Sequence, residues 1–426
     1  MATLTREPAL RRPAPLPLRS AVGLAGPAFV ASVAYIDPGN FATNFTAGAQ
    51  YGYALIWVVV AANVMAILVQ YLSSKVGIVT GMSLPELCRE RFGPRLNRAL
   101  WVQAEVVVMA TDVAEFVGCA FGLHLLLGIP LFWAGVATAV AVSVVLPLRR
   151  LGSRPFERVI VLMLIAVAVC IGYLLVAGGP QDASAMLQGL SPSFEDGTIG
   201  LAVGIVGATV MPHAVYLHSG LQRDRLRESR AVGTPPPTAA ILRASRWDCV
   251  VGLGAAGMVN LMMLGFAAAA FAGVATASGD AFELDTMPAA LDALLGGGAV
   301  MAFGVALVFS GFSSATVGTY AGEMVMEGFI GRRIPLAVRR GVTMVPSLLV
   351  LGLPVSIGQA LVFSQVILSF GIPFALVTLL VVTRDAKIMG AAANRWTTTA
   401  AMAVVTALIS LLNGYLVVET VLQLRS

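Results

Sequence analysis

The sequence predicts an all-α integral membrane protein with about eleven transmembrane helices. Of its 426 residues, 58% are hydrophobic and only 12% are charged, and the mean hydropathy is +0.86. Soluble chains usually carry about 25% charged residues, so this composition indicates a membrane protein. Apolar segments long enough to cross a bilayer lie at 21–49, 54–78, 99–127, 130–148, 157–178, 198–220, 249–275, 298–327, 336–355, 358–383 and 398–421.

Two of these segments, the first and the sixth, contain motifs that a continuous helix does not tolerate. The first contains Asp37-Pro38-Gly39-Asn40 and the sixth contains Met211-Pro212-His213. Proline removes a backbone donor and glycine adopts unusual dihedral angles, so each helix should unwind there. Unpaired backbone groups survive in a membrane only where they line a protein-enclosed cavity. A matched pair of breaks in two halves of a chain therefore indicates the substrate site of a transporter.

The spacing of the two breaks predicts an inverted repeat. Five segments separate the start of one broken helix from the start of the other, and an odd number of crossings turns the second unit upside down in the membrane. We therefore expect a tail at 1–20, a five-helix repeat at 21–178, a second, inverted repeat at 198–383 and an additional helix at 398–421. The longest connection is predicted to be an Arg/Pro-rich loop at 222–246.

The distribution of charge predicts the orientation of the chain. Cytoplasmic loops collect Lys and Arg, and the basic residues here fall in alternate loops, together with the N-terminal tail. The opposite loops contain Asp and Glu but no Lys or Arg, except Arg425 in the last residues. We expect a multi-pass protein of the cell (inner) membrane with a cytoplasmic N-terminus and an extracytoplasmic C-terminus. The net charge of +5 follows from this bias, so no nucleic-acid partner is needed to explain it.

The residue types in the two breaks indicate a divalent metal ion as the substrate. Asp37 and Asn40 supply a carboxylate and an amide oxygen, which alone would suit Ca²⁺ or Mg²⁺. Met211 adds a soft thioether, which binds alkaline-earth ions poorly and accepts Mn²⁺, Fe²⁺, Co²⁺ or Cd²⁺ more readily. A methionine in an apolar helix usually only packs, but its position directly before Pro-His in a break favours a ligand that acts as a selectivity filter.

Asp37 also provides a basis for coupling to protons. An isolated carboxylate inside the membrane is costly, and a bound cation offsets that cost, so the site can exchange a proton for a metal ion. The alternative reading of Asp37 is a structural cap of the helix that follows it.

The third segment predicts a route for the released proton. Glu105, Asp112 and Glu115 lie at i, i+7 and i+10 and share one helical face in an otherwise apolar stretch. Candidate counter-ions are Arg339 and Arg340, and a static ion-pair network is the alternative. His213 and His218 could relay protons because histidine titrates near neutral pH, or could be hydrogen-bonded core residues.

Five motifs together resemble the Nramp metal transporters, the natural resistance-associated macrophage protein family. They are the stretches 34–44, 111–116, 211–219, 322–329 and 364–373, and the similarity extends from about residue 20 to the end. The resemblance implies a LeuT-like fold and proton-coupled import of manganese, iron and similar ions by alternating access. It also implies that the carbonyls of Ala34 and Ala208 are metal ligands, that the Gln365 side chain joins them on occlusion, and that Arg339 and Arg340 face Asp112 and Glu115.

Other functions find less support in the sequence. A P-loop and an HExxH motif are absent, and no triad spacing is recognisable, so we expect neither an ATP-driven pump nor an enzyme. No cofactor and no obligate protein partner are predicted; the partners are metal ions, protons and the lipid bilayer. The alternative is a LeuT-like symporter of an organic solute such as an amino acid, although Asp37 would repel a substrate carboxylate.

Overall fold

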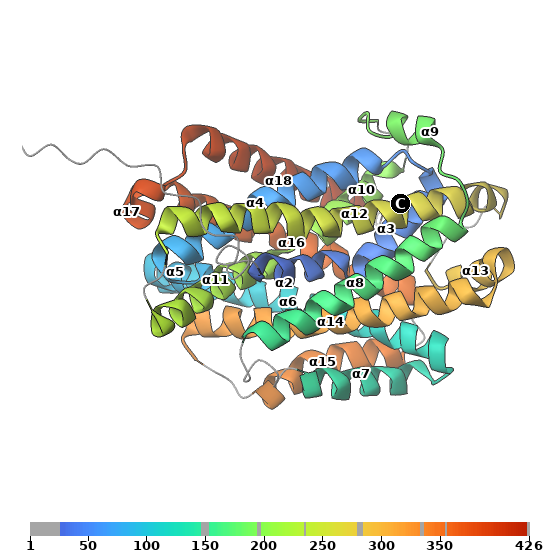
Figure 1. Ribbon diagram of the computed structural model, residues 1–426, viewed down its shortest axis with the longest axis horizontal. Helices are drawn as coiled ribbons and strands as arrows, with labels where there is room; N and C mark the ends of the chain where they lie inside the picture. The colour runs from blue at the N-terminus through green and yellow to red at the C-terminus, as the bar shows by residue number, and fades with distance from the viewer. Residues whose placement is uncertain are drawn as a thin grey trace, which may run out of the picture.

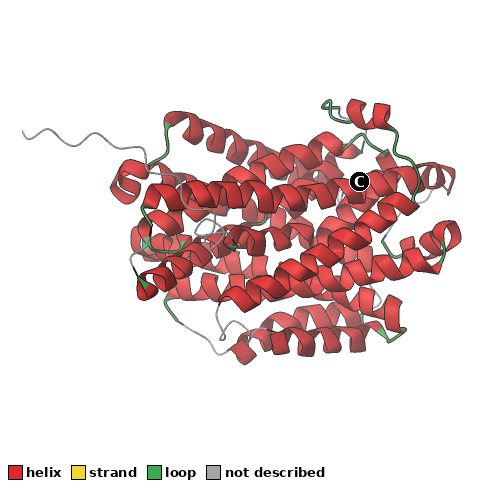
Figure 2. Ribbon diagram, in the orientation of Figure 1, coloured by secondary structure: helices red, strands yellow, loops and turns green. Residues whose placement is uncertain are grey.

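The computed structural model describes residues 26–145, 153–193, 197–233, 236–278, 284–332, 336–353 and 356–423. Within these ranges every regular element is a helix, and most helices run along the long axis of the molecule (Figures 1 and 2). The elements are α2 (Pro27–Val33), η1 (Ala34–Ile36), α3 (Pro38–Tyr51), α4 (Ile56–Thr80), α5 (Leu84–Arg91), α6 (Pro94–Leu127), α7 (Leu131–Val145), α8 (Ser153–Ala177), α9 (Ala183–Gln188), α10 (Thr198–Thr209), α11 (Pro212–Val232), α12 (Thr238–Ser278), α13 (Met287–Leu295), α14 (Gly297–Ile330), α15 (Leu336–Gly352), α16 (Ile357–Arg384), α17 (Ala386–Met389), η3 (Gly390–Ala392) and α18 (Trp396–Gln423).

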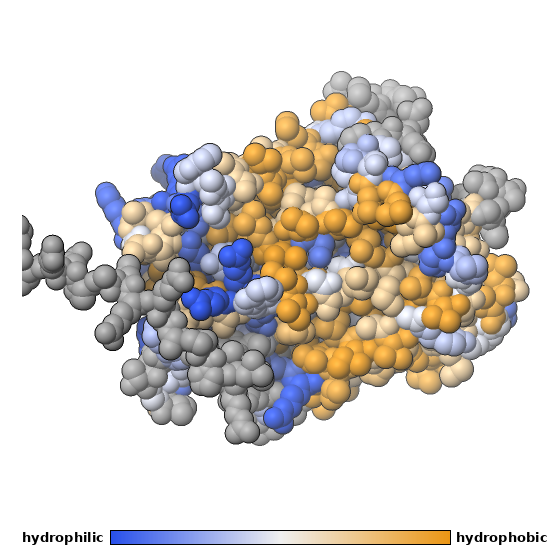
Figure 3. Space-filling model, turned by 45° about the horizontal axis from the view of Figure 1, so that its top comes forward, coloured by the Kyte–Doolittle hydropathy of each residue, from blue (hydrophilic) through white to orange (hydrophobic). Residues whose placement is uncertain are grey.

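The helices have the lengths and the surface of a membrane protein. Eight stretches in the described part of the chain are long and apolar enough to cross a bilayer, and three shorter apolar helices lie at Pro27–Ile36, Leu131–Val144 and Gly341–Gly352. Hydrophobic residues form a broad belt between two more polar ends (Figure 3). The all-α membrane class is thus confirmed, whereas the total of eleven spans and the repeat boundaries at 21–178, 198–383 and 398–421 stay predictions.

Both predicted helix breaks are present. The first helix ends in the three-residue 3₁₀ turn η1, and Asp37 is extended, with φ −87° and ψ 167°, before α3 begins at Pro38. The sixth is divided between α10 and α11, where Met211 is extended with φ −80° and ψ 120°. In each case proline occupies the first position of the new helix, where its missing N–H costs nothing.

The packing of long helices places the two breaks in the interior. Helix α3 packs against α12 and α10, α10 packs against α16, and α6 packs against α14. The residues of both breaks, from Ala34 to Asn40 and from Ala208 to His213, are all buried. The breaks therefore lie within protein and not against lipid, as their unpaired backbone groups require.

The predicted loop at 222–246 is wrong over most of its length. Helix α11 continues to Val232 and α12 begins at Thr238, so little more than the proline cluster separates them. Arg, Leu and Glu are good helix formers, and they extend both helices beyond the apolar segments. The short amphipathic helix α5 was also not predicted from hydropathy. The tail at 1–20 lies outside the described residues.

Candidate functional site

Asp37 and Asn40 are paired within the first break. The fully buried Asp37 is the N-cap of α3, and its Oδ1 accepts hydrogen bonds from the backbone N of Asn40 at 2.9 Å and from Asn40 Nδ2 at 2.7 Å. The cap satisfies a backbone donor at the start of α3, so the structural reading of Asp37 applies to this oxygen. Its Oδ2 is turned to other partners.

Asn40 connects the first break to the second. Its Nδ2 also donates to the carbonyl oxygen of Ala208 at 2.9 Å, across 168 residues of sequence. Ala208 lies four residues before Pro212, and a proline cannot supply the N–H that a helical carbonyl would accept. The same spacing relates Ala34 to Pro38. The two prolines thus release the carbonyls of Ala34 and Ala208 from normal helical hydrogen bonding.

Met211 lies in the second break with its side chain fully buried. It is extended directly before α11 and lies three residues after Ala208, which belongs to the last turn of α10. The thioether and the Ala208 carbonyl therefore belong to one short segment, whose carbonyl already contacts Asn40.

Gln365 reaches the same site from α16. Its Nε2 donates to Asp37 Oδ2 at 3.3 Å, and its Oε1 has no hydrogen-bond partner within the described residues. Gly39 makes this approach possible, because a Cβ at that position would overlap the Gln365 amide and lie 2.8 Å from Asp37 Oδ2. The structure thus brings Asp37, Asn40, Ala208 and Gln365 together at the breaks.

The remaining carbonyls of the first break are held by two residues that our sequence analysis missed. Asn260 Nδ2 of α12 donates to the carbonyl of Tyr35 at 3.0 Å, and Ser310 Oγ of α14 donates to the carbonyl of Ile36. The available signal was Asn260, a lone polar residue in an apolar segment, whereas Ser310 stands close to Ser313 and Ser314 and gave no such signal. These contacts fix the unwound backbone while leaving the Ala34 carbonyl to other partners.

Helix α6 places two carboxylates beside the site. Asp112 and Glu115 are buried, and Thr111 Oγ1 lies 3.2 Å from Nδ1 of His213, two residues after Met211. Gly118, one turn after Glu115, packs against Pro38, since a Cβ there would overlap the proline ring. The predicted carboxylate face of α6 therefore begins next to both breaks.

The other predicted proton-route residues are placed less directly. His218 Nδ1 lies 3.0 Å from Gln70 Oε1, and Gln70 Nε2 donates to Tyr35 Oη at 2.7 Å, so the two histidines face different helices. Glu105 is only half-buried and accepts a bond from Trp101 Nε1 at 3.1 Å. Arg339 and Arg340 belong to α15, which packs against α6, but their side chains lie outside what the structure describes.

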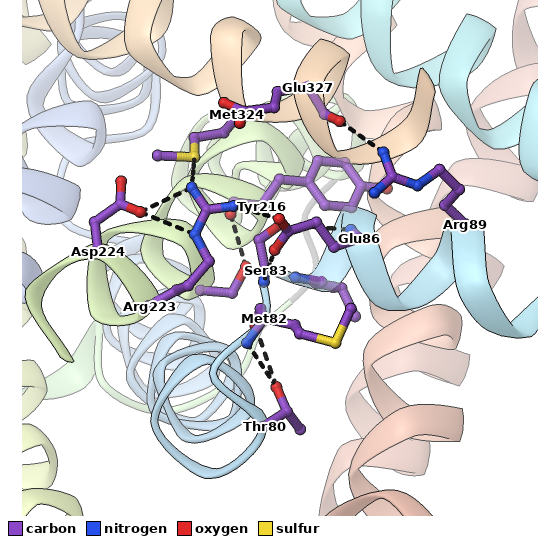
Figure 4. Close-up of polar contacts among 12 residues, drawn as sticks. Thr80, Met82, Ser83, Glu86, Arg89, Tyr216, Arg223, Asp224, Met324 and Glu327 are labelled. Carbon is purple, nitrogen blue, oxygen red and sulfur yellow. Dashed lines mark hydrogen bonds and ion pairs between the residues drawn. The ribbon is translucent and has the colours of Figure 1, made fainter. Parts of the chain in front are cut away.

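A second polar cluster surrounds the buried Arg223 of α11 (Figure 4). Its Nη1 lies 2.7 Å from Glu86 Oε1 of α5, while its Nη2 lies 2.8 Å from Asp224 Oδ1 and 3.3 Å from Met324 Sδ of α14. Burial raises the pKa of Glu86, but the Arg223 bond and the Ser83 backbone outweigh burial, so the net pKa is lowered. This cluster ties α11 to α5 and α14, and sequence reasoning did not find it.

The candidate site combines the carboxylate of Asp37 with neutral polar groups. Within the described residues, no group of three or more His, Cys, Asp and Glu side chains could hold a metal ion. Structural zinc sites normally use four such ligands. The site offers instead the carboxylate of Asp37, the amide groups of Asn40 and Gln365, and the released carbonyl of Ala208, while Met211 follows Ala208 by three residues.

Comparisons with known proteins agree with this architecture. Residues 28–419 match the family model described as natural resistance-associated macrophage protein-like, Nramp. The chain is 44% identical over 406 residues to the divalent metal cation transporter MntH of Deinococcus radiodurans, covering 95% of this chain and 92% of the relative. It is 45% identical over 412 residues to the transporter of the same name from Mycobacterium tuberculosis, with coverage of 95% and 93%.

Solved structures support the fold. The manganese transporter of Eremococcus coleocola, in complex with an aromatic bis-isothiourea substituted compound, is similar with a TM-score of 0.78 at 30% identity, covering 93% of this chain and 86% of that one. Mhp1, a nucleobase-cation-symport-1 family transporter, gives a TM-score of 0.56 at 17% identity and covers 83% and 77%, a likeness of fold alone. With a family match over most of its length and these identities, the chain belongs to the natural resistance-associated macrophage protein (Nramp) family.

Proposed function

We propose that this chain imports divalent transition-metal ions such as Mn²⁺ and Fe²⁺ across the cell membrane, coupled to protons and working by alternating access. The observation that carries the proposal is the position of Asn40 Nδ2, bonded at once to Asp37 Oδ1 in one break and to the Ala208 carbonyl in the other. Two oxygens suited to a cation therefore lie on either side of one amide group. The names of the relatives, divalent metal cation transporters, support a transporter of this kind and not an enzyme.

The proposed ligands are Asp37, Asn40, Met211, Gln365 and the carbonyls of Ala34 and Ala208. A cation that takes the Asp37 and Ala208 oxygens must displace Asn40 Nδ2, and a half-turn of the amide then presents Asn40 Oδ1 to the ion. Gln365 can respond in the same way, since its buried Oε1 is without a partner in the described structure while its Nε2 contacts Asp37. In both side chains the amide NH₂ group would thus turn away from the site and the amide oxygen would turn toward the bound ion.

Met211 would supply selectivity. Ca²⁺ and Mg²⁺ prefer oxygen ligands, and a thioether in the coordination shell takes the place of one oxygen ligand. Softer transition-metal ions tolerate this exchange. Mn²⁺ and Fe²⁺ would therefore bind in preference to the more abundant alkaline-earth ions.

The proton would leave Asp37 as the metal binds and pass along α6. His213 is the first proposed relay, because its Nδ1 lies 3.2 Å from Oγ1 of Thr111, the residue before Asp112. Asp112 and Glu115, followed by Glu105, would form the route, with Arg339 and Arg340 as counter-ions on α15. His218 belongs to a separate hydrogen-bonded chain with Gln70 and Tyr35, which supports a positioning role more than a relay.

The proposed orientation follows the distribution of charge. Helices α5 and α17 lie at one end of the molecule, and α9 and α13 lie at the other (Figure 1). The first end carries Arg89, Arg91 and Lys387, whereas the second carries Asp182 and Asp292. By the positive-inside rule the α5 end is cytoplasmic, so metal would enter from the α9 end.

An uptake assay in proteoliposomes tests the proposal directly. Mn²⁺ flux should be competed by Fe²⁺, Co²⁺ and Cd²⁺ but only weakly by Ca²⁺ or Mg²⁺, and it should rise when the outside is made acidic. Asp37→Ala should abolish the flux. Flux of an organic solute such as an amino acid, with no competition from metal ions, would support the alternative symporter and contradict this proposal.

A further inference from the structure

Asn44 is a buried amide for which neither the fold nor the proposed metal site accounts. It lies in α3, its side chain is fully buried, and neither Nδ2 nor Oδ1 has a hydrogen-bond partner within the described residues. Burying an unpaired amide opposes folding. An amide kept in this position is therefore expected to meet a ligand at some stage of the protein's work.

Asn44 continues the helical face that carries the candidate site. Asp37, Asn40 and Asn44 follow one another at i, i+3 and i+7, so their side chains lie in one row along α3. The next residues of the row are Ala47 and Tyr51, at the far end of the helix. Asn44 is the one polar side chain between the metal site and that end of the row.

The helix that faces this row offers Asn44 no polar side chain. Helix α10 runs antiparallel to α3: Ala208 contacts Asn40, and Gly204 packs near Thr43, while Gly197 lies beside Tyr51. The turn of α10 at the level of Asn44, residues 201–205, consists of Leu, Ala, Val, Gly and Ile, which have no polar side-chain atoms. No side chain of this turn can form a hydrogen bond with the Asn44 amide.

Asn44 also lies on one defined side of the metal site. Helix α3 leads from the break toward the end of the molecule that carries α9, where Gly189, after α9, accepts a bond from Trp57 N at 2.9 Å. That is the end through which metal enters under the proposed function. An entering ion that follows this face meets Asn44 before Asn40 and Asp37.

We propose that Asn44 Oδ1 forms a second, outer binding position, at which a partly hydrated divalent cation pauses before it passes to Asp37. This inference rests on the proposed function. A neutral amide oxygen binds such an ion weakly, which suits a position that must release it inward. Capture is the step that this position would assist, so it affects the apparent affinity for external metal more than the maximal rate.

The test compares Mn²⁺ uptake into proteoliposomes by four variants. Asn44→Leu keeps the size of the side chain and Asn44→Ala shortens it; both should raise KM about tenfold with kcat changed less than about twofold. Asn44→Asp should lower KM and let Ca²⁺ compete. Thr43→Ala is the matched control, because among the described residues the Thr43 hydroxyl bonds only within its own helix, to Gly39 O at 3.1 Å and Asn40 O at 3.4 Å.

The outcomes separate this inference from the proposed function. The proposed function holds if the wild type transports Mn²⁺ and Asp37→Ala does not. In that case the outer position is overturned if KM is unchanged in Asn44→Leu and Asn44→Ala and Ca²⁺ does not compete in Asn44→Asp. A purely structural role for Asn44 would not create Ca²⁺ competition in the aspartate variant. If the wild type moves no Mn²⁺, or Asp37→Ala moves it normally, the proposed function itself fails and the outer position fails with it.

Discussion

Gln365 Nε2 lies 3.3 Å from Asp37 Oδ2, which joins residues 328 positions apart at the first helix break. The contact exists because the residue between them in space, Gly39, has no side chain. The Gln365 amide thereby connects helix α16 to the Asp37 carboxylate. Any movement of α16 relative to α3 changes the environment of the Asp37 carboxylate.

The first prediction follows from Gly39. In Gly39→Ala the new methyl group would overlap the Gln365 amide, so Gln365 must withdraw from Asp37. We expect the initial rate of Mn²⁺ uptake to fall at least about tenfold, since misplacement of a binding group by about 1 Å has large effects. Gly200→Ala is the control, because a Cβ at that helical position would have no described atom outside its own helix within 4 Å. Wild-type uptake by Gly39→Ala would show that the Gln365 contact is dispensable.

The second prediction concerns selectivity. Met211→Ala should retain part of the Mn²⁺ transport but accept Ca²⁺ and Mg²⁺, because water can replace the thioether in the ligand shell. The measurement is competition by Ca²⁺ against Mn²⁺ uptake. Met263→Ala is the matched control, since Met263 is equally buried but lies in α12. Unchanged exclusion of Ca²⁺ in the Met211 variant would contradict the filter.

The third prediction concerns coupling. Glu115→Gln keeps the shape of the side chain but cannot carry a negative charge, so it should weaken proton co-flux more than Mn²⁺ binding. Proton flux is measured with a pH-sensitive dye inside the liposomes, and binding is measured by calorimetry on the purified protein. Equal losses of both quantities would instead assign Glu115 to a static ion-pair network.

The fourth prediction concerns the Arg223 cluster. Glu86→Gln removes the charge of one of the two carboxylates that contact the buried Arg223 guanidinium, and Asp224 stays 2.8 Å from it. A hydrogen bond to a charged group contributes about 1.5–3 kcal/mol to stability. We expect a clearly lower Tm for the detergent-solubilised protein at pH 7. Glu90→Gln is the control, because Glu90 is exposed on the same helix.

The same pair predicts a pH dependence. The pKa of Glu86 is lower in the folded protein than in the unfolded chain, so its stabilising contribution is complete above about pH 4.5 and is lost as the pH falls through the folded value. The difference in Tm between wild type and Glu86→Gln should therefore shrink in acid. A difference that stays constant from pH 7 to well below about pH 4.5 would show that the charge of Glu86 is not the cause.

The fold class and the helix breaks could be predicted because their signals are local. Hydropathy reports spans directly, and Pro38 and Pro212 each remove a specific N–H, whatever the rest of the fold does. The pairing of Asp37 with Asn40 is equally local, since the two residues are three apart.

The contacts that complete the site could not be predicted in this way. Asn260 and Ser310 hold the carbonyls of Tyr35 and Ile36 from helices more than 200 residues away, and no periodicity in the sequence indicates which helices will be neighbours. The polar ends of helices α11 and α12 were missed because hydropathy shows where an apolar segment stops, and a helix can continue beyond that point. His213 and His218 could not be distinguished in the sequence, yet His213 contacts Thr111 of α6 and His218 contacts Gln70 of α4.

The two breaks also determine the electrostatic character of the site through helix dipoles. The short first helix and α10 end at the site with their carbonyl termini, which carry partial negative charge and favour a cation. Helices α3 and α11 begin there with their amide termini, which carry partial positive charge and stabilise the carboxylate of Asp37. Each break thus contributes one pole of each sign, so the field favours a carboxylate and a metal ion together, and a neutral solute would gain little from it.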